Sequence, residues 1–307
     1  MVGPRPLAVG LAGAGRWASD VHASLWAAGP ETRLAGVWSR RSEPAGRLAA
    51  SHGVPAFETF EALVEASEAI AFAIPPAVQA DLAPLAIASG RAVVLEKPLA
   101  EDVLGARRIA DAVDAAGVGS VVSLSYRFSP VVRYFLRRAA DFEVAGARGC
   151  FLSGAFLDGR FDGTWRGTHG ALLDAGPHLI DLAEAALGPF TRIEGETSPG
   201  GWTSLVAGHA SGAVSDLSIC CHAAITPSRT EVEVFGPGGS LSVDARAGRE
   251  EGFAVLRTEF AETARRGGGH PLDARHGAAL QEWVSAAIAA TRRAPSAPPT
   301  PTPTQTP

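Results

Sequence analysis

The chain has 307 residues, of which 46% are hydrophobic and 19% charged, and its formal net charge is −5 at pH 7. This composition predicts a soluble globular protein of about two domains, and it argues against disorder and against a broad nucleic-acid-binding surface. No apolar run approaches the roughly 18 residues that span a membrane, and the start of the chain lacks a signal peptide's apolar core, so a cytoplasmic location is expected.

Short apolar strands alternate with helices through the first part of the chain. The expected strands cover residues 7–13, 33–40, 69–75, 92–98 and 120–128, and the expected helices end near residue 28 or cover residues 42–53, 59–66, 77–90 and 101–117. These strands lack polar alternation, which indicates a parallel sheet buried on both faces. We therefore expect a doubly wound α/β domain, a Rossmann fold, over residues 1–124.

A glycine-rich turn joins the first expected strand to the first helix. Residues 13–18, GAGRWA, match the pattern G-x-G-x-x-G/A. In that pattern Gly13 permits the tight turn, Gly15 lets the backbone approach a pyrophosphate, and Ala18 allows close packing of helix on sheet. Free amides at the helix start then meet the phosphates. The alternative is a glycine-rich turn without a ligand.

The end of the second strand bears on which dinucleotide is bound. NAD sites carry an acidic residue there, which holds the ribose 2′-hydroxyl. This chain instead has Ser39, Arg40 and Arg41. A hydroxyl and guanidinium groups bind a 2′-phosphate that a carboxylate would repel, so NADP is expected in preference to NAD. The alternative for the two arginines is a solvated loop.

The second part of the chain has a different pattern. Strand-like segments joined by turns predict a mostly antiparallel sheet, with helices at about residues 171–188 and 271–293. We expect an α+β domain over residues 125–294, with one sheet face left for assembly into a homodimer or homotetramer. The proline- and threonine-rich residues 295–307 are expected to be a disordered tail.

Lys97 is the only lysine among the 27 basic residues of the chain. An ammonium group can lose its proton when it is desolvated or crowded by charge, whereas a guanidinium effectively cannot. A single lysine therefore indicates proton chemistry or a compact point charge at that position, with chance as an equal alternative.

A second chemical signal lies in the helix expected at residues 171–188. Asp174 and His178 are four residues apart, which places them on one helical face, and Asp181 follows. Pro177 would kink a helix beyond its first turn, so an alternative is a helix that starts near Gly176 or is bent there. A carboxylate near an imidazole raises its pKa and orients it for acid–base work near neutral pH. The alternatives are a helix-capping aspartate with a core histidine, or a zinc site. The three cysteines form no ligand framework, so no metal is expected.

Several motifs together resemble the glucose–fructose oxidoreductase and inositol dehydrogenase (Gfo/Idh/MocA-type) family of NAD(P)-dependent oxidoreductases, from about residue 6 to residue 293. They are GLAGAGRWASDVH, AIPPAVQADLAPLAIASG, VVLEKPLA, SYRFSP, GALLDAGPHLIDL, EVFGPGGSLSVD and HPLDARHG. The resemblance implies that Lys97, Asp174 and His178 meet beside the nicotinamide. Lys97 would orient the substrate hydroxyl and take part in proton transfer. His178 would be the acid–base group, and Asp174 would position His178 and a substrate hydroxyl.

The resemblance also suggests which other residues contact the ligands. Many relatives have a histidine where this chain has Gln79. The expected cofactor contacts are Gly13, Gly15, Arg16, Trp17, Ala18, Ser39, Arg40, Arg41, Pro75, Gln79, Glu96 and Lys97. The tentative substrate contacts are Tyr126, Arg127, Trp165, Arg166 and His169, each of which also suits a structural role. The structural alternative for Glu96 is pairing with the backbone or with a cation. The structural alternative for Asp181 is support of the helix.

The leading hypothesis is an NAD(P)-dependent oxidoreductase acting on a secondary alcohol or ketone of a sugar, cyclitol or related polyol. A variant is a ketoreductase for a modified or nucleotide-linked sugar. The alternatives are glycoside cleavage through transient oxidation by a tightly held NAD, and a non-catalytic NADP-binding sensor. The identity of the small-molecule substrate and the direction of the reaction stay open.

Overall fold

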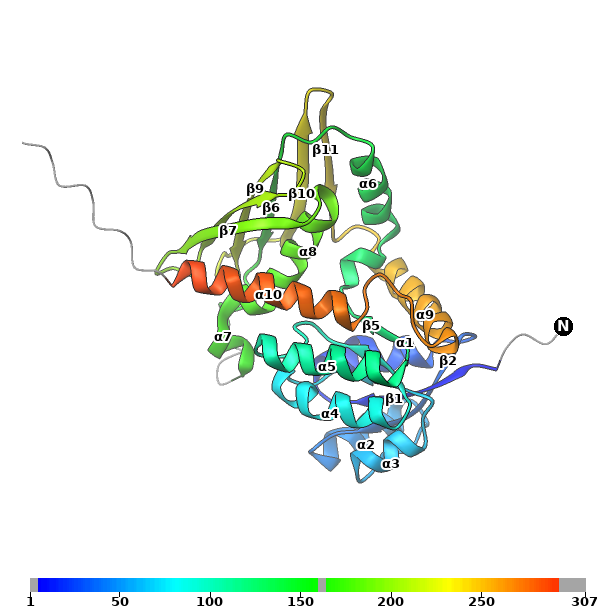
Figure 1. The fold of residues 1–307 in the computed structure, drawn as a ribbon. Coiled ribbons are helices and arrows are strands. Elements are labelled where there is room, and N and C mark those ends of the chain that lie inside the picture. Colours follow the sequence, from blue (N-terminus) through cyan, green and yellow to red (C-terminus); the bar gives the residue numbers. More distant parts are fainter. Residues whose placement is uncertain (1–4, 160–163, 293–307) are drawn as a thin grey trace, which may run out of the picture.

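Two β-sheets, one in each part of the chain, organise the molecule (Figure 1). The computed structural model describes residues 5–159 and 164–292, without the side chains of residues 168 and 169. The expected tail at residues 295–307 lies outside this description. Within the described residues, no helix is both long and apolar enough to cross a membrane.

The first sheet is entirely parallel, with the strand order β2-β1-β3-β4-β5. Its strands are β1 (Leu7–Ala12), β2 (Thr32–Trp38), β3 (Ala69–Phe72), β4 (Ala92–Leu95) and β5 (Ser120–Val122). Nearly all of their side chains are buried, as expected for a sheet covered on both faces. The predicted doubly wound fold is therefore confirmed. The last strand is shorter than predicted, because the chain turns into a 3₁₀ helix, η2, at Ser125–Phe128.

The helices of this half begin and end at recognisable signals. They are η1, a π-helical turn (Ala18–His22), α1 (Ala23–Ala27), α2 (Ser42–Ser51), α3 (Phe60–Glu65), α4 (Pro76–Ala88) and α5 (Val103–Ala116). The side chains of Thr59 and Asp102 cap α3 and α5 by accepting backbone N–H groups. Gly117 ends α5 in the left-handed conformation.

The second sheet has six strands in the order β11-β10-β6-β9-β8-β7. Its strands are β6 (Gly146–Leu152), β7 (Phe190–Thr197), β8 (Thr203–His209), β9 (Val214–Cys220), β10 (Arg229–Gly236) and β11 (Gly239–Asp244). Only β6 and β9 pair in parallel, so the prediction of a mostly antiparallel sheet is confirmed. Helix α8 (Gly176–Leu187) covers one face, where Leu217 and Val232 are buried, and the opposite face carries polar side chains such as Asp216 and Glu231.

Two helices of the second half pack back onto the first half. Helix α9 (Arg249–Arg266) contacts α1, β5 and η2, and α10 (Ala274–Thr291) lies along α5 and also contacts β7 (Figure 1). Neither α9 nor α6 (Pro130–Ala140) was predicted from the sequence. Because the halves share these contacts, the boundary between residues 124 and 125 stays a proposal.

Candidate active site

A cavity of about 750 Å³ lies outside the carboxyl ends of β1, β3 and β4. In parallel sheets, this is the edge at which ligands bind, at the point where the strand order reverses. The order β2-β1-β3 places that point between β1 and β3. The cavity is lined by Gly15, Arg16, Trp17, Asp20, Arg41, Ala73, Ile74, Pro75, Pro76, Glu96, Lys97, Pro98, Thr164, Trp165 and Arg166. It therefore joins the glycine-rich turn to the Glu-Lys-Pro motif.

The glycine-rich turn is built as a dinucleotide-binding turn requires. Gly13 has a φ of +133°, and a Cβ there would lie 2.3 Å from the carbonyl oxygen of Ala73. Gly15 has no atom within 4 Å of an added Cβ, so its open side is the cavity. Ala18 is fully buried against the sheet. The space over Gly15 fits the close approach of a pyrophosphate to the backbone.

The end of β2 brings one predicted arginine to this cavity. Arg41 is among its lining residues, and the backbone N–H of Arg41 lies 3.4 Å from the hydroxyl of Ser39. Arg40 and Arg41 are both exposed. Within residues 5–159 and 164–292, neither guanidinium has an ion pair or a side-chain hydrogen bond. Both groups are therefore available to an anionic ligand.

Lys97 follows β4 and is held by Asp174 of α7 (Trp165–Asp174). The Lys97 ammonium donates hydrogen bonds of 2.7 Å to the Asp174 carbonyl oxygen and 2.9 Å to its Oδ1. The lysine side chain is 12% exposed, and the peptide bond to Pro98 is cis. An ammonium has three N–H donors. Two point to Asp174, which leaves one for a ligand in the cavity.

Asp174 binds two cations on opposite carboxylate oxygens. Its Oδ2 lies 3.2 Å from the Nε of Arg166, whose guanidinium stacks 4.5 Å from the ring centroid of Trp165. Burial alone would raise the pKa of Asp174, but the charges of Lys97 and Arg166 outweigh burial and lower it. Asp174 is therefore an anion that orients Lys97 and Arg166.

The predicted pairing of Asp174 with His178 is not what the structure contains. The helix is interrupted at Ala175. Asp174 therefore ends α7, and His178 belongs to the first turn of α8, where Pro177 is tolerated. The helix expected at residues 171–188 is thus two helices, and the second begins at Gly176, the alternative that Pro177 indicated.

The imidazole of His178 is held by aromatic rings instead of a carboxylate. Its ring centroid lies 4.8 Å from that of Tyr126 and stacks 6.4 Å from that of Phe151. Its Nδ1 is buried and has no hydrogen-bond partner. Burial, with the charges of Lys97 and Arg249, lowers the pKa of His178 well below its ordinary value, although Asp174 opposes them. The expected rise in the pKa of His178 was wrong, because burial and two nearby cations outweigh the single carboxylate of Asp174.

Glu96 forms a buried network beneath the cavity. Its Oε1 accepts 2.8 Å hydrogen bonds from Trp17 Nε1 and His22 Nε2. Trp26 Nε1 lies 3.2 Å from His22 Nδ1. An indole N–H can only donate, so Nδ1 accepts and the proton of His22 is on Nε2. The network ties the glycine-rich turn to the residue that precedes Lys97.

Gln79 and Arg127 are predicted contacts that bind other parts of the protein instead. Gln79 is fully buried, and its amide bonds the backbone of Glu96 and Leu99 at 2.8 to 2.9 Å. Gln79 thus supports the Lys97 loop from beneath and does not face the cavity. Arg127 forms a 2.8 Å ion pair with the buried Asp181 and lines a different hollow. The side chain of His169 lies outside the described residues.

The sequence analysis assigned no role to two residues beside the cavity. His22 falls within a quoted motif, and its four-residue spacing to Trp26 could have predicted their contact. Arg249 begins α9, and its guanidinium lies 5.4 Å from the ring centroid of Trp17 and 5.7 Å from that of Tyr126. No local pattern pointed to Arg249, because its neighbours come from distant parts of the chain.

Comparisons with known proteins agree with this architecture. A family model described as an oxidoreductase family with an NAD-binding Rossmann fold matches residues 7–124. The crystal structure of GenD2 from gentamicin A biosynthesis, in complex with NAD, superposes with a TM-score of 0.84 at 22% identity, covering 94% of each chain. This likeness supports the whole fold, including the second sheet.

Sequence relatives are also found among characterised enzymes. The chain is 30% identical over 275 residues to dTDP-3,4-didehydro-2,6-dideoxy-alpha-D-glucose 3-reductase of Streptomyces violaceoruber, which covers 83% of this chain and 78% of the relative. It is 28% identical over 129 residues to levoglucosan dehydrogenase of Pseudarthrobacter phenanthrenivorans. That match covers 39% of this chain and 33% of the relative.

Proposed function

The chain belongs to the Gfo/Idh/MocA family of oxidoreductases with an NAD-binding Rossmann fold, and from this premise we propose its substrate class and the roles of its residues. It is an oxidoreductase acting on CH–OH groups. The proposed reaction is hydride transfer between a nicotinamide cofactor and a secondary alcohol or ketone of a sugar, cyclitol or related polyol. The observation that carries the proposal is that Lys97 and the glycine-rich turn line one cavity.

The residues around the turn fit a dinucleotide. The space over Gly15 takes the pyrophosphate, and the cavity continues from there past Pro75 to Lys97. We propose that NADP is preferred to NAD. Arg40 and Arg41 support this preference, because two exposed guanidinium groups without partners among the described residues favour a ribose 2′-phosphate.

We propose that Lys97 binds the reacting oxygen of the substrate. Two of its N–H groups are fixed by Asp174, so the third has a defined direction into the cavity. Its positive charge stabilises negative charge that develops on the oxygen during hydride transfer. Arg166, on the other oxygen of Asp174, borders the same space and is proposed to contact a further substrate hydroxyl.

His178 is the proposed acid–base group. Its low pKa keeps the imidazole neutral, and Nε2, which unlike Nδ1 is not among the buried nitrogens, can accept the proton of a substrate hydroxyl during oxidation. In reduction the same nitrogen returns the proton. The bound nicotinamide supplies or receives the hydride. Tyr126 holds the ring by packing against it.

The test combines cofactor binding with turnover. Quenching of tryptophan fluorescence by NADPH and by NADH measures the two affinities, and NADPH should bind more tightly. A panel of sugar ketones is then assayed by NADPH absorbance. Lys97→Met should lower kcat by about 100-fold or more while retaining cofactor binding. If the wild-type protein binds neither cofactor, the proposed function is excluded.

We further propose that copies of the chain associate through the open face of the second sheet. Exposed apolar side chains there, Val206, Val214 and Phe235, support this idea. So does a hollow of about 500 Å³ over β6, β9, β10 and β11.

A further inference from the structure

Arg249 has a buried guanidinium nitrogen without a partner. Its Nε makes no hydrogen bond, and across residues 5–159 and 164–292 its side chain has no ion pair. Three aromatic rings surround the guanidinium, with ring centroids at 5.4 Å for Trp17, 5.5 Å for Phe253 and 5.7 Å for Tyr126. Aromatic faces attract a cation but provide no acceptor for its N–H groups.

Neighbouring inner arginines are all neutralised by carboxylates. Arg127 pairs with Asp181 at 2.8 Å, and Arg133 pairs with Glu259 at 2.6 Å. Arg166 pairs with Asp174, as described above. The Arg249 side chain is only partly buried, and among the described residues no carboxylate pairs with it. Its guanidinium is thus open to an anionic ligand.

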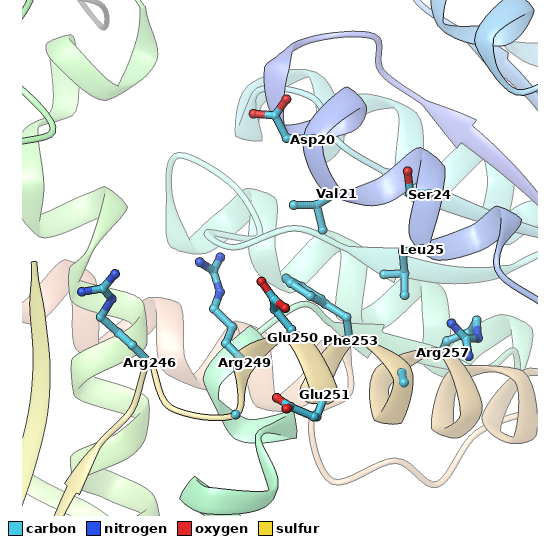
Figure 2. Close-up of a pocket in the computed structure, with 12 residues that line it drawn as sticks. Asp20, Val21, Ser24, Leu25, Arg246, Arg249, Glu250, Glu251, Phe253 and Arg257 are labelled. Carbon is cyan, nitrogen blue, oxygen red and sulfur yellow. The ribbon is translucent and has the colours of Figure 1, made fainter. Parts of the chain in front are cut away.

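The guanidinium borders a second cavity, of about 770 Å³, between α9 and the helix that follows β1. Figure 2 shows Arg246 and Arg249 extending in the same direction from the segment that leads into α9. Gly248 caps α9 without a side-chain bond, so the first backbone N–H groups of the helix also favour an anion.

Acidic residues at this cavity do not neutralise Arg249. Glu250 and Glu251 belong to the first turn of α9 and are exposed, and Asp20 pairs with Arg16 at 3.1 Å. A nucleoside diphosphate or a sugar phosphate is within the size range of ligands held by cavities of this volume.

The second cavity adjoins the candidate active site. Asp20 lines both cavities. Trp17 lines the active-site cavity. Its ring packs against that of Phe253, which lines the second cavity, with ring centroids 6.4 Å apart. Tyr126 contacts both Arg249 and His178. The two cavities therefore meet at Asp20, and Arg249 and His178 share Tyr126 as a neighbour.

We propose that Arg249 binds a phosphate group of the substrate, so that the enzyme acts on a phosphorylated or nucleotide-linked sugar. This inference rests on the proposed function and adds the substrate class. A relative that covers most of the chain is named as the reductase of a dTDP-linked sugar, which agrees with it.

The test measures binding separately from turnover. The wild-type protein is first saturated with NADPH, so that the glycine-rich turn cannot take the probe. It is then titrated calorimetrically with dTDP, glucose 6-phosphate and glucose. One or both phosphate compounds should bind more tightly than glucose. Which of the two binds better distinguishes a nucleotide-linked substrate from a sugar monophosphate.

Substitution then assigns the binding to Arg249. Arg249→Gln should weaken phosphate binding by about 10- to 100-fold, whereas Arg249→Lys should retain part of it. Arg266→Gln, at the far end of the same helix, is the matched control and should bind like wild type. If Arg249→Gln does not fold, Arg249→Lys and Arg249→Met are compared instead.

The outcomes separate the two proposals. Equal binding of dTDP, glucose 6-phosphate and glucose to wild type, or phosphate binding unchanged in Arg249→Gln, overturns the phosphate inference. NADPH binding and turnover of a neutral sugar ketone would still support the proposed function in that case. Failure of the protein to bind NADPH concerns the proposed function instead.

Discussion

Gly13 and Gly15 stand two positions apart in one turn but face different surroundings. An added methyl group at Gly13 meets backbone, whereas at Gly15 it meets only the cavity. We expect Gly13→Ala to lower the free energy of unfolding by at least about 2 kcal/mol, from steric overlap and a strained φ. Gly15→Ala should leave stability nearly unchanged but weaken NADPH binding by about tenfold or more, which equals about 1.4 kcal/mol.

Thermal denaturation and NADPH titration of the two variants check this contrast. Each variant is the other's control, because both substitutions add one methyl group. A stable Gly15→Ala protein with wild-type affinity for NADPH would mean that the cofactor does not pass over Gly15.

The low pKa of His178 predicts the pH dependence of oxidation. A base must be neutral to accept a proton, so the rate is full above its pKa and falls below it. We expect kcat/KM for alcohol oxidation to hold its value down to pH clearly below about 6.5, the ordinary histidine pKa. Removing the positive charge in Arg249→Gln should raise the pKa of His178. The acid limb of the pH profile, the range in which the rate falls as the pH is lowered, should then move to higher pH.

Stopped-flow or steady-state rates across the pH range measure this limb. His178→Asn should abolish it while leaving the protein folded. A limb at or above pH 6.5 in the wild type, or one that stays in place in Arg249→Gln, contradicts the assignment.

At the scale of single residues, motif spacing identified groups that the fold does bring together. Lys97, Trp165 and Arg166 line one cavity, as local motifs and the resemblance suggested. The partners of Gln79, Arg127 and His178 could not be predicted. Each depends on burial and on residues far along the chain, such as Asp181 for Arg127.

At the scale of elements, Glu96 connects β4 to the helix after β1. It accepts the indole N–H of Trp17 and the imidazole N–H of His22 in a buried position. We expect Glu96→Ala to lower the free energy of unfolding by about 2–5 kcal/mol, because two buried donors lose their acceptor. Denaturant unfolding measures the loss, and Glu58→Ala, at an exposed position in the same half of the chain, is the control.

The same network predicts how stability depends on pH. Burial alone would raise the pKa of Glu96, but hydrogen bonding and charge from His22, with Trp17, lower it in the folded protein. A lowered pKa means that this stabilisation is present above the unfolded pKa of about 4.3 and is lost as the pH falls through the folded pKa. The stability of Glu96→Ala should therefore fall less steeply with acid than that of wild type.

Helices with hydrophobic periodicity and capping residues were predictable, but others were not. The pattern for α9 is weak, although Glu250 and Glu251 at its start and Arg265 and Arg266 at its end suit the helix dipole. The Ser129-Pro130 pair that begins α6 is a further start signal. The break at Ala175 was foreseeable from Pro177 alone.

At the scale of the whole molecule, the fold class followed from strands of two kinds. Strands β1 and β3 of the first half are apolar throughout, and those of the second alternate, as in β9. The order of the second sheet and its parallel pair of β6 with β9 were not predictable, because they join residues far apart in sequence.

Ion pairs also connect the two halves. Arg257 of α9 lies 2.9 Å from Glu31, and Arg107 of α5 lies 2.6 Å from Glu282 of α10. They add to the packing of α9 and α10 on the first half.

The polar open face predicts that self-association depends on salt. Arg148, Asp216 and Glu231 lie on that face beside a few apolar side chains. On this mixed face, the attraction between charged side chains is screened at high ionic strength, whereas the apolar contacts are not. We expect sedimentation velocity to give a larger species at about 0.05 M salt than at about 0.5 M. Arg148→Glu should reduce the larger species, and Arg266→Glu should not. A monomer at both salt concentrations would rule out this assembly.

Because the chain has one lysine, a reagent that labels ε-amines labels a single side chain. Reductive methylation with carbon-13 formaldehyde would place one isotopic reporter on an ε-amine, and that amine is Lys97 beside Asp174. The other labelled amine, the chain's α-amino group, is distinguished by its different chemical shift. Nuclear magnetic resonance could then follow every ligand that enters the cavity through one signal, without any cysteine tag or engineered handle.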